Sequence, residues 1–561
     1  MKRSRSPSPQ GFRVKKNSLL QKVLADPKKQ MEIANENAAG AKYVIDGPLR
    51  RVPPYYYTYL TFAKERWLKR TLLDVFTTEF RDKEESYYKK AIETGQVTVN
   101  KLAAGVDQVL KNGDLISHRT HKHEQPVSSR PIKIVYEDDD MVVIDKPGGI
   151  PAHPTGRFNF NSVVQALKYE HNLECHPCNR LDRLTSGLMF LAKNPKFAER
   201  IGQQIRDREV SKQYLARVVG EFPLGTVVCE EPVSTVNPKV ALNMVDYSET
   251  GKESKTTFQR VSYDGTTSIV KCLPHTGRTH QIRVHLQFLG HPIANDPVYS
   301  NPQVWGETLG KLAYKKMEVP NEKVPKDGVA VDVKEVSVRL DSIGKTEPAR
   351  SWWDQSPGER LSGGKCEVCS SPLYTDPGPN DLDLWLHAMK YAADDGSWSF
   401  ETAVPDWAAE THNKFMEMAL REAEKAPLVD SAFCVGAVLV KDGQVLETGY
   451  TRELEGNTHA EQCALAKYAA KHDSPVPDGT VLYTSMEPCS LRLSGNEPCV
   501  DRILKTPIKT VFVGVVEPGD FVKENDGQKK LENAGVIYLH IPGFEDEAIR
   551  IAKRGHSDAN S

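Results

Sequence analysis

The stretch RLDRLTSG at residues 180–187 is the most informative part of this chain of 561 residues. It places the carboxylate of Asp182 between an apolar leucine and an arginine, and it ends in the small pair Ser186 and Gly187. A carboxylate held in a fixed position can act as a nucleophile or as a base. A glycine permits the close approach of another backbone segment. We therefore expect residues 180–187 to form the active-site segment of an enzyme domain.

Three further segments around this stretch carry a recognisable pattern. They are DKPGGIPAHPTG at 145–156, SKQYLA at 211–216 and GRTHQIRVHL at 277–286, and they are followed by GHPI at 290–293 and by Asp296. Together with RLDRLTSG they resemble the RluA-type pseudouridine synthases over roughly residues 62–340. The resemblance implies an enzyme that isomerises uridine in RNA to pseudouridine without a metal or a cofactor.

The same resemblance implies roles for individual residues. Asp182 would be the catalytic residue, and Arg283 would hold its carboxylate ionised and oriented. Tyr214 would stack on the target base or hydrogen-bond to it, and would assist proton removal. Arg180 and Arg278 would contact RNA. Because the uridine must leave the base stack to reach such a pocket, base flipping is implied.

A second signature begins about 280 residues later. His459 and Glu461 stand in the motif HAE, and Cys489 and Cys499 each follow a proline. One imidazole and two thiolates form a ligand set for Zn²⁺ that leaves a fourth position open for water. Glu461 would then be a general acid and base rather than a ligand. The alternative is a structural or decayed zinc site.

The spacing of the two cysteines distinguishes between deaminase families. Nine residues, SLRLSGNEP, separate Cys489 from Cys499, whereas cytidine deaminases have two. The longer spacing resembles the riboflavin-pathway deaminases, and the segments CVGAVLV at 434–440 and HAEQCAL at 459–465 agree with them over about residues 406–542. Substrate contacts are predicted within the inserted segment, at Arg492, Ser494 and Asn496.

The full arrangement resembles the fungal bifunctional proteins that join a tRNA pseudouridine synthase to a riboflavin-pathway deaminase. The N-terminal half would modify a uridine in the anticodon loop of cytoplasmic tRNA, at position 32. The C-terminal half would deaminate 2,5-diamino-6-ribitylamino-4(3H)-pyrimidinone 5'-phosphate. The expected partners are therefore tRNA and a small pyrimidine phosphate. Two alternatives stay open, in which the deaminase domain acts on tRNA bases or the N-terminal half only binds RNA.

The charge of the chain is unevenly distributed. Residues 374–561 hold 18 Lys and Arg against 31 Asp and Glu, whereas residues 1–373 hold 56 against 44. A basic N-terminal half suits a polyanion such as RNA, and an acidic C-terminal half argues against a second RNA-binding surface. The chain has no run of 18 apolar residues, so no membrane span is predicted.

Composition also bears on location. No signal-peptide pattern opens the sequence, and 10 cysteines in 561 residues are too few for a disulfide scaffold. We therefore predict the cytoplasm, with the nucleus as an alternative because nine Lys and Arg lie in the first 30 residues. An RNA-contacting arm or a solubilising tail would explain those charges equally well.

The predicted fold combines α+β and α/β domains. WLKRTLLDVFTTEF at 67–80 has the spacing of an amphipathic helix, and YYKKAIETGQVTVN at 87–100 reads as a helix, a break at Gly95 and a strand. These features resemble an S4-like RNA-binding module, the alternative being a small α+β cap. We divide the chain into a disordered basic tail and lead-in at 1–60, the S4-like module at 61–125, a mixed α/β synthase domain with an antiparallel sheet at 130–342, a linker at 343–404, a three-layer α/β/α cytidine-deaminase-like domain at 405–545, and a C-terminal tail at 546–561.

Two C-x₂-C pairs are not used by either signature. Cys366 and Cys369 form one pair, and Cys175 and Cys178 form the other. Four such cysteines could make a structural zinc site together. The alternative is that all four are reduced and free of metal, because 187 residues separate the pairs.

Overall fold

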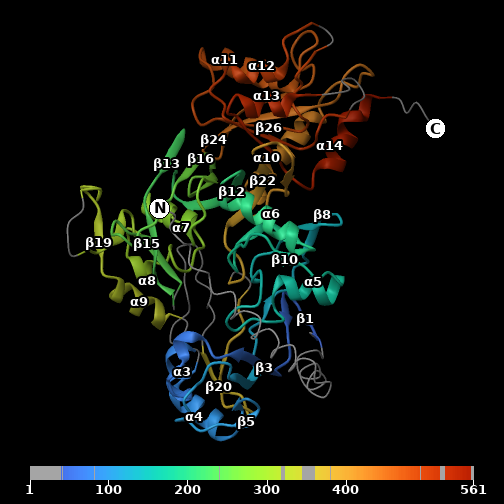
Figure 1. Ribbon diagram of the computed structural model, residues 1–561. Helices are drawn as coiled ribbons and strands as arrows, with labels where there is room; N and C mark the ends of the chain where they lie inside the picture. The colour runs from blue at the N-terminus through green and yellow to red at the C-terminus, as the bar shows by residue number, and fades with distance from the viewer. Residues whose placement is uncertain are drawn as a thin grey trace, which may run out of the picture. The chain divides into compact units, whose positions relative to one another are not determined.

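The computed structural model describes residue 40 and residues 42–80, 83–238, 241–317, 322–343, 361–378, 381–492, 495–518 and 525–556 (Figure 1). The predicted basic tail falls almost entirely on residues 1–39, which lie outside this range, and so does Ser494. The chain divides into two compact units. The first consists of residues up to 129 together with 153–174 and 362–376, and the second of 130–152, 175–361 and 377–561.

A four-stranded antiparallel sheet forms the centre of the first unit, in the order β3-β6-β4-β5. Its strands are β3 (Tyr55–Phe62), β6 (Leu115–Lys122), β4 (Val97–Val99) and β5 (Leu102–Ala103). Helices α3 (Leu72–Glu79) and α4 (Glu85–Glu93) contribute apolar side chains to one buried cluster with this sheet. The break predicted at Gly95 is present, since its φ of 72° lies in the left-handed region that favours glycine.

Helix α3 starts later than the hydrophobic pattern predicted. Trp67 lies in the short 3-10 helix η1 (Glu65–Trp67), and Lys69 has a φ of 66° that interrupts the helical backbone. Thr71 then caps α3, because its hydroxyl accepts a hydrogen bond from the Asp74 amide at 3.3 Å. The amphipathic stripe is nevertheless correct, since Leu72 and Phe76 are buried.

The remaining elements of the first unit are short. They are β1 (Val44–Asp46), β2 (Leu49–Arg51), β7 (Val127–Ser128), helix α5 (Val163–His171), and the hairpin of β20 (Leu361–Lys365) and β21 (Pro372–Tyr374). Residues 44–60 were predicted as an unstructured lead-in, and the structure differs. Their strands pair with one another and with segments far along the chain, a contact that no local pattern reveals.

A ten-stranded sheet dominates the second unit. Eight strands run in the order β13-β16-β17-β12-β22-β11-β9-β8. In addition, β10 pairs with β11, and β23 pairs with β22. The bounds are β8 (Lys133–Glu137), β9 (Met141–Lys146), β10 (His176–Pro177), β11 (Ser186–Ala192), β12 (Val210–Val219), β13 (Thr226–Cys229), β16 (Thr256–Tyr263), β17 (Thr267–Pro274), β22 (Leu386–Ala393) and β23 (Ser399–Glu401). The predicted hairpin of 132–136 with 141–144 is confirmed as β8 and β9, which pair antiparallel.

Strand β22 corrects the predicted linker. Residues 343–404 were assigned to a linker because of their Pro, Gly and Ser content, yet Leu386–Ala393 lies in the middle of the sheet between β12 and β11. Gly187 explains how this strand fits. A Cβ at that position would lie 2.3 Å from the Ala388 carbonyl oxygen, so only glycine permits the approach. The close backbone contact expected at Ser186 and Gly187 is therefore confirmed.

A smaller sheet and four helices complete the part of the second unit that precedes residue 343. The sheet has the order β14-β15-β18-β19, formed by β14 (Val233–Asn237), β15 (Leu242–Val245), β18 (Ala313–Lys315) and β19 (Val329–Val331). The helices are α6 (Pro195–Arg206), α7 (Gln281–Phe288), α8 (Pro302–Trp305) and α9 (Val333–Ser342). Every residue of α7 is buried, which fixes the side chains that its first turn presents.

The C-terminal part is a three-layer α/β/α sandwich. Its five-stranded sheet has the order β25-β24-β26-β27-β28, from β24 (Gly436–Lys441), β25 (Gln444–Tyr450), β26 (Val481–Thr484), β27 (Thr510–Val513) and β28 (Ile537–His540). Helix α10 (Asp406–Ala423) packs on one face, with α14 (Glu545–Ala552) against it. The other face is covered by α11 (Ala460–His472), α12 (Cys499–Leu504) and α13 (Gly527–Asn533).

Helix α14 corrects the predicted tail at 546–561. Its Ala548 and Ile551 are buried against Leu420 of α10, which is why this segment is ordered although RGHSDANS directly after it resembles a frayed end. Among the described residues, no helix is long and apolar enough to span a bilayer.

Candidate active sites

The first site is a cavity of about 360 Å³ in the second unit. Asp182 enters it from the loop before β11, Tyr214 from β12 and Arg283 from α7. Arg180 and Arg278 line it as well. All five residues predicted for this site therefore line one cavity, although they come from three separate parts of the sequence.

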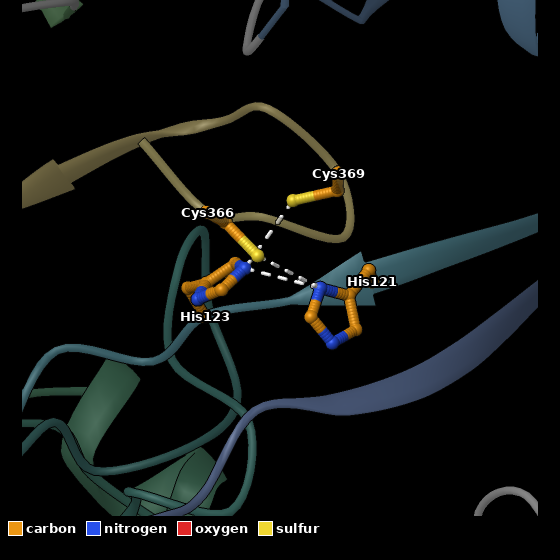
Figure 2. A group of neighbouring side chains, drawn as sticks. All are labelled: His121, His123, Cys366 and Cys369. Atoms are coloured by element: carbon orange, nitrogen blue, oxygen red, sulfur yellow. Dashed lines mark hydrogen bonds between the residues drawn. The ribbon is translucent and has the colours of Figure 1, made fainter. Parts of the chain in front are cut away.

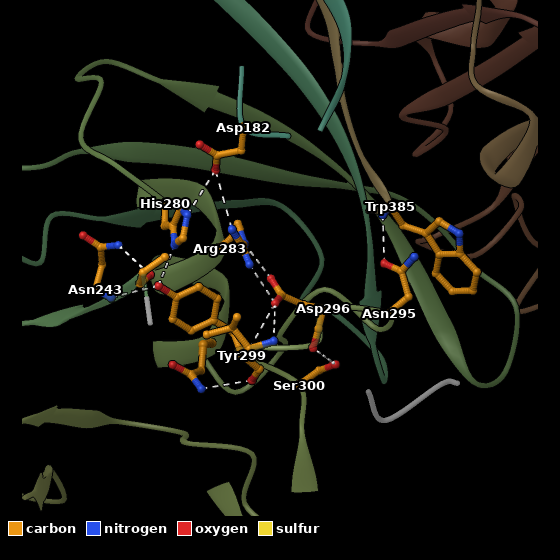
Figure 3. Close-up of polar contacts among 12 residues, drawn as sticks. Asp182, Asn243, His280, Arg283, Asn295, Asp296, Tyr299, Ser300 and Trp385 are labelled. Atoms are coloured by element: carbon orange, nitrogen blue, oxygen red, sulfur yellow. Dashed lines mark hydrogen bonds and ion pairs between the residues drawn. The ribbon is translucent and has the colours of Figure 1, made fainter. Parts of the chain in front are cut away.

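The Asp182 carboxylate contacts two side chains of one segment (Figure 3). Its Oδ2 lies 3.4 Å from His280 Nε2 and 3.5 Å from Arg283 Nη1. Arg283 is held in turn by Asp296, which accepts from its Nε at 2.7 Å and from its Nη2 at 2.9 Å. Although burial opposes ionisation, the Arg283 guanidinium keeps the pKa of Asp296 below its usual range. Arg283 thus presents a fixed positive charge to Asp182.

His280 stands in the segment GRTHQIRVHL, which did not by itself indicate a role for it. The structure places His280 at the site. The Tyr299 hydroxyl accepts from the Asn243 amide at 3.1 Å and lies 2.9 Å from His280 Nδ1. Tyr299 can therefore donate its own hydrogen to Nδ1, which leaves the imidazole proton on Nε2, facing Asp182. Burial, together with Arg283, lowers the pKa of His280 to about 4. His280 is thus a neutral hydrogen-bond donor at pH 7.

The low pKa of His280 predicts a pH dependence of stability. An unfolded chain binds the His280 proton near pH 6.5 and the folded chain near pH 4, so the free energy of unfolding falls as the pH falls through this window. His280→Gln keeps a donor but removes the titration, and should lessen this loss by about 3 kcal/mol. Urea unfolding of both proteins between pH 4 and pH 7 measures the difference. Parallel stability curves would show that His280 is not buried as a neutral group.

Tyr214 forms a pair that the sequence did not reveal. Its hydroxyl lies 2.5 Å from the hydroxyl of Tyr391 on β22, and at the cavity Tyr391 is buried and Tyr214 partly buried. Burial is the main cause that raises the pKa of Tyr214 well above its ordinary value, and the neighbouring Tyr391 is the second cause. The phenol is therefore protonated at neutral pH. It suits hydrogen bonding or stacking against a base better than proton removal in the resting state.

Lys146 connects two of the recognised segments. This fully buried side chain donates to the carbonyl oxygens of Pro147 at 2.8 Å, Ile150 at 2.9 Å and Arg183 at 3.2 Å. It therefore fastens the loop after β9 to the loop that carries Asp182. Burial lowers its pKa to about 7. We assign Lys146 a positioning role that the motif alone did not indicate.

The second site brings together the three predicted metal ligands. His459 precedes the first residue of α11, Cys499 begins α12, and Cys489 lies in the loop between them. His459 Nδ1 lies 3.4 Å from each sulfur, and the three donor atoms all lie within 4.8 Å of one another. The Cys499 side chain and then His459 lower the pKa of the Cys489 thiol to about 4. One nitrogen and two sulfur donors at these distances fit Zn²⁺.

Glu461 lines a cavity of about 140 Å³ together with the two metal-ligand candidates His459 and Cys489. The first turn of α11 presents it beside His459, where it is 2% exposed and accepts a hydrogen bond from the Thr484 hydroxyl at 3.1 Å. Burial is the main cause that raises the pKa of the Glu461 carboxyl above the usual range, and the nearby Cys489 is the second cause. A buried carboxyl with a raised pKa is suited to accept and return a proton.

The three predicted substrate contacts differ in placement. Arg492 lines the cavity, but its guanidinium donates to Gln462 Oε1 at 3.1 Å and to the Asn457 carbonyl. Asn496 is exposed and is not among the described residues that line the cavity. Ser494 lies outside the described residues.

Glu517 is a cavity residue to which the motif had given no role. It lines the wall with Glu461, and Asn525 donates to it at 2.9 Å. Burial is the main cause that raises the pKa of the Glu517 carboxyl to about 7, and the nearby Cys489 is the second cause. A second carboxyl that can be neutral at pH 7 offers a hydrogen-bond donor and acceptor to a polar ring.

Both parts of the chain match known families. Residues 140–288 match the RNA pseudouridylate synthases, and residues 409–515 match the cytidine and deoxycytidylate deaminase zinc-binding region. The first range contains Asp182 and Arg283. The second contains the three metal-ligand candidates His459, Cys489 and Cys499.

Three relatives extend these matches. A mitochondrial tRNA pseudouridine(32) synthase of Saccharomyces cerevisiae is 54% identical over 376 residues, which cover 65% of this chain and 78% of the relative. A human pseudouridylate synthase is 44% identical over 459 residues, covering 73% of this chain and 83% of the relative. A diaminohydroxyphosphoribosylamino-pyrimidine deaminase of Schizosaccharomyces pombe is 46% identical over 145 residues, covering 26% of this chain and 36% of that relative.

The yeast similarity corrects the predicted location. We expected the cytoplasm, or else the nucleus, from the absence of a signal-peptide pattern and from the basic N-terminus. The yeast relative is a mitochondrial enzyme, which contradicts that expectation. The error arose because the basic, Ser-rich start of the chain was considered only as an RNA-binding arm, a nuclear signal or a solubilising tail. Mitochondrial transit peptides are also Arg-rich, Ser-rich and poor in acidic residues.

Proposed function

We propose that this chain, which belongs to the RNA pseudouridylate synthases and carries a cytidine-deaminase-type domain, isomerises uridine 32 of mitochondrial tRNA and deaminates a riboflavin precursor. The observation that carries the synthase activity is the contact of Asp182 with His280 and Arg283 in one cavity. The yeast relative, a synthase for position 32, supports the tRNA position.

The geometry of the first site accounts for the isomerisation in terms of charge. Arg283 and neutral His280 converge on one oxygen of Asp182, which orients this carboxylate at the wall of the cavity. The carboxylate can act as a nucleophile or base on a uridine flipped out of its stack. Tyr214 and Tyr391 would bound the base with aromatic surface and hydroxyl groups.

The first unit is proposed as an S4-like RNA-binding module. It contains a cavity of about 820 Å³ lined by aromatic and basic side chains, which include Tyr59, Tyr87, Lys64, Lys83 and Lys122. Aromatic rings can stack on unpaired bases, and lysines can contact the phosphates. The basic balance of residues 1–373 supports the same assignment.

The second site supports hydrolysis of an exocyclic amine. His459, Cys489 and Cys499 would hold a Zn²⁺ ion, which when bound would supply Lewis-acid activation of water. Glu461 would accept a proton from the attacking water and deliver it to the leaving amine. Glu517 would bind the polar edge of the pyrimidine. The Schizosaccharomyces relative is named as a deaminase of a diaminohydroxyphosphoribosylamino-pyrimidine, which supports a phosphorylated diaminopyrimidine as the class of substrate.

A substrate panel tests the deaminase assignment. Zinc-loaded full-length protein is offered the ribitylaminopyrimidinone phosphate, free cytidine and unmodified tRNA, and ammonia release is measured. We expect turnover of the first substrate alone, because the domain is acidic and carries the long Cys489–Cys499 insertion. Turnover of tRNA alone would contradict the proposal and make the chain a two-site RNA-modifying enzyme.

A further inference from the structure

The first unit contains a second group of metal-binding side chains (Figure 2). His121 lies on β6 and His123 follows it, whereas Cys366 and Cys369 lie in the turn between β20 and β21. Their four donor atoms all lie within 4.8 Å of one another. The partners of this C-x₂-C pair are therefore two histidines rather than Cys175 and Cys178, which the sequence had offered as one alternative.

The two sulfur–nitrogen distances within this group match those of a tetrahedral site, and the nitrogen–nitrogen distance is slightly shorter. Cys366 Sγ lies 3.6 Å from His121 Nδ1, His123 Nε2 lies 3.3 Å from Cys369 Sγ, and the two ring nitrogens are 3.1 Å apart. Bonds of about 2.3 Å to sulfur and about 2.0 Å to nitrogen place tetrahedral ligands roughly 3.3–3.8 Å apart. Both cysteines are free thiols, so no disulfide competes for the sulfurs.

The turn that carries the cysteines is shaped as a ligand loop. The Val368 amide donates to Cys366 Sγ at 3.3 Å, a contact that stabilises a thiolate. Ser370 adopts a φ of 58° and donates its amide to the Cys366 carbonyl at 2.8 Å, which closes the turn around the two sulfurs. A two-stranded hairpin is marginally stable on its own. It therefore needs an additional constraint to keep this geometry.

We propose that His121, His123, Cys366 and Cys369 bind a structural Zn²⁺ ion that fastens the β20–β21 hairpin to β6. Four protein donors close the coordination sphere, which distinguishes this site from the open three-ligand deaminase site. Segments more than 240 residues apart in sequence are joined in this way. The metal free energy would add to the contacts that already hold the short hairpin, such as that of Lys83 Nζ with Ser371 Oγ at 3.3 Å.

The consequence concerns the large cavity of the same unit. Residues Ser371–Asp376, which begin two positions after the second cysteine, line that cavity, and so do His121 and His123. The zinc ion would therefore fix one wall of the proposed RNA-binding cavity. Its role is structural, because four protein donors leave no open position for a water molecule.

Zinc content of the purified full-length protein tests the proposal. We expect about two zinc ions per chain in the wild type and about one in Cys366→Ser/Cys369→Ser. The matched control, Cys175→Ser/Cys178→Ser, removes the other C-x₂-C pair and should keep about two. Cys489→Ser/Cys499→Ser should keep about one, at the site proposed here. An unchanged zinc content in Cys366→Ser/Cys369→Ser would overturn the proposal, whatever the deaminase does.

A spectroscopic measurement covers the case in which the serine variant does not fold. Cys489→Ser/Cys499→Ser protein is loaded with Co²⁺ in place of zinc, and its near-ultraviolet spectrum is recorded. Thiolate-to-cobalt charge transfer from Cys366 and Cys369 is expected, and adding Cys175→Ser/Cys178→Ser, which removes the other C-x₂-C pair, should leave this band unchanged. Absence of that band would overturn the proposal, and so would a mass lower by two hydrogens, which reports a Cys366–Cys369 disulfide.

Discussion

Asp182→Asn is expected to abolish pseudouridine formation while leaving tRNA binding nearly unchanged. Asparagine has the size of aspartate and can still accept from His280 and Arg283, which lie 3.4 and 3.5 Å from Oδ2. It has no negative charge and is a poor nucleophile and a poor base. Loss of a nucleophile that acts with its neighbours reduces turnover by at least about 10⁴-fold. Arg283 keeps Asp296 as its partner, so the local fold should survive.

Single-turnover pseudouridine formation on a tRNA transcript measures this effect, with binding of the same transcript recorded in parallel. The chain supplies its own control, because deamination by the variant should equal that of the wild type. Residual synthase activity above one hundredth of the wild-type rate would remove Asp182 from the catalytic role. A parallel loss of deamination would instead indicate a folding defect.

The synthase site was predictable where the motif itself carries chemistry. Asp182, Tyr214 and Arg283 stand in segments with a fixed pattern, and the structure places all three at one cavity. Tyr391 was missed because it lies in a segment whose Pro, Gly and Ser content predicted a linker. A strand whose partners are 170 to 200 residues earlier has a register that only the folded sheet defines.

The deaminase site was likewise predictable only for the residues of its motif. The ligand triad follows from residue type and spacing, because a zinc ion requires those donors at short distance. The substrate contacts within the insertion did not follow, since a loop conformation depends on hydrogen bonds to distant groups. Arg492 is turned toward Gln462 and Asn457, and Asn496 is exposed. Glu517 enters the cavity from a loop after β27 that has no metal-ligand spacing.

The histidine and cysteine group of the first unit shows why a lone C-x₂-C motif is difficult to interpret. His121 and His123 alternate along a strand and its continuation, a spacing that carries no metal signature by itself. The sequence offered a second C-x₂-C pair as the obvious partner. Only the pairing of a hairpin with the end of β6 brings the correct donors together.

Glu461→Gln is expected to abolish deamination and to leave pseudouridine formation at the wild-type rate. Glu461 is 2% exposed, lines the cavity with the His459 and Cys489 donors, and has its pKa raised by burial. Glutamine keeps the acceptor for Thr484, which donates to Glu461 Oε1 at 3.1 Å. It cannot carry a proton between water and the leaving amine. Removal of a general acid and base costs on the order of 10³-fold or more.

Ammonia release from the ribitylaminopyrimidinone phosphate measures the loss, and zinc content separates it from a ligand defect. Because Glu461 is not a ligand in this geometry, the variant should hold as much zinc as the wild type. Thr484→Val is the matched variant, since it removes the hydrogen bond but keeps the carboxyl, and should lose far less activity. If Glu461→Gln lost zinc in proportion to its activity, the carboxylate would be a metal ligand rather than the proton carrier.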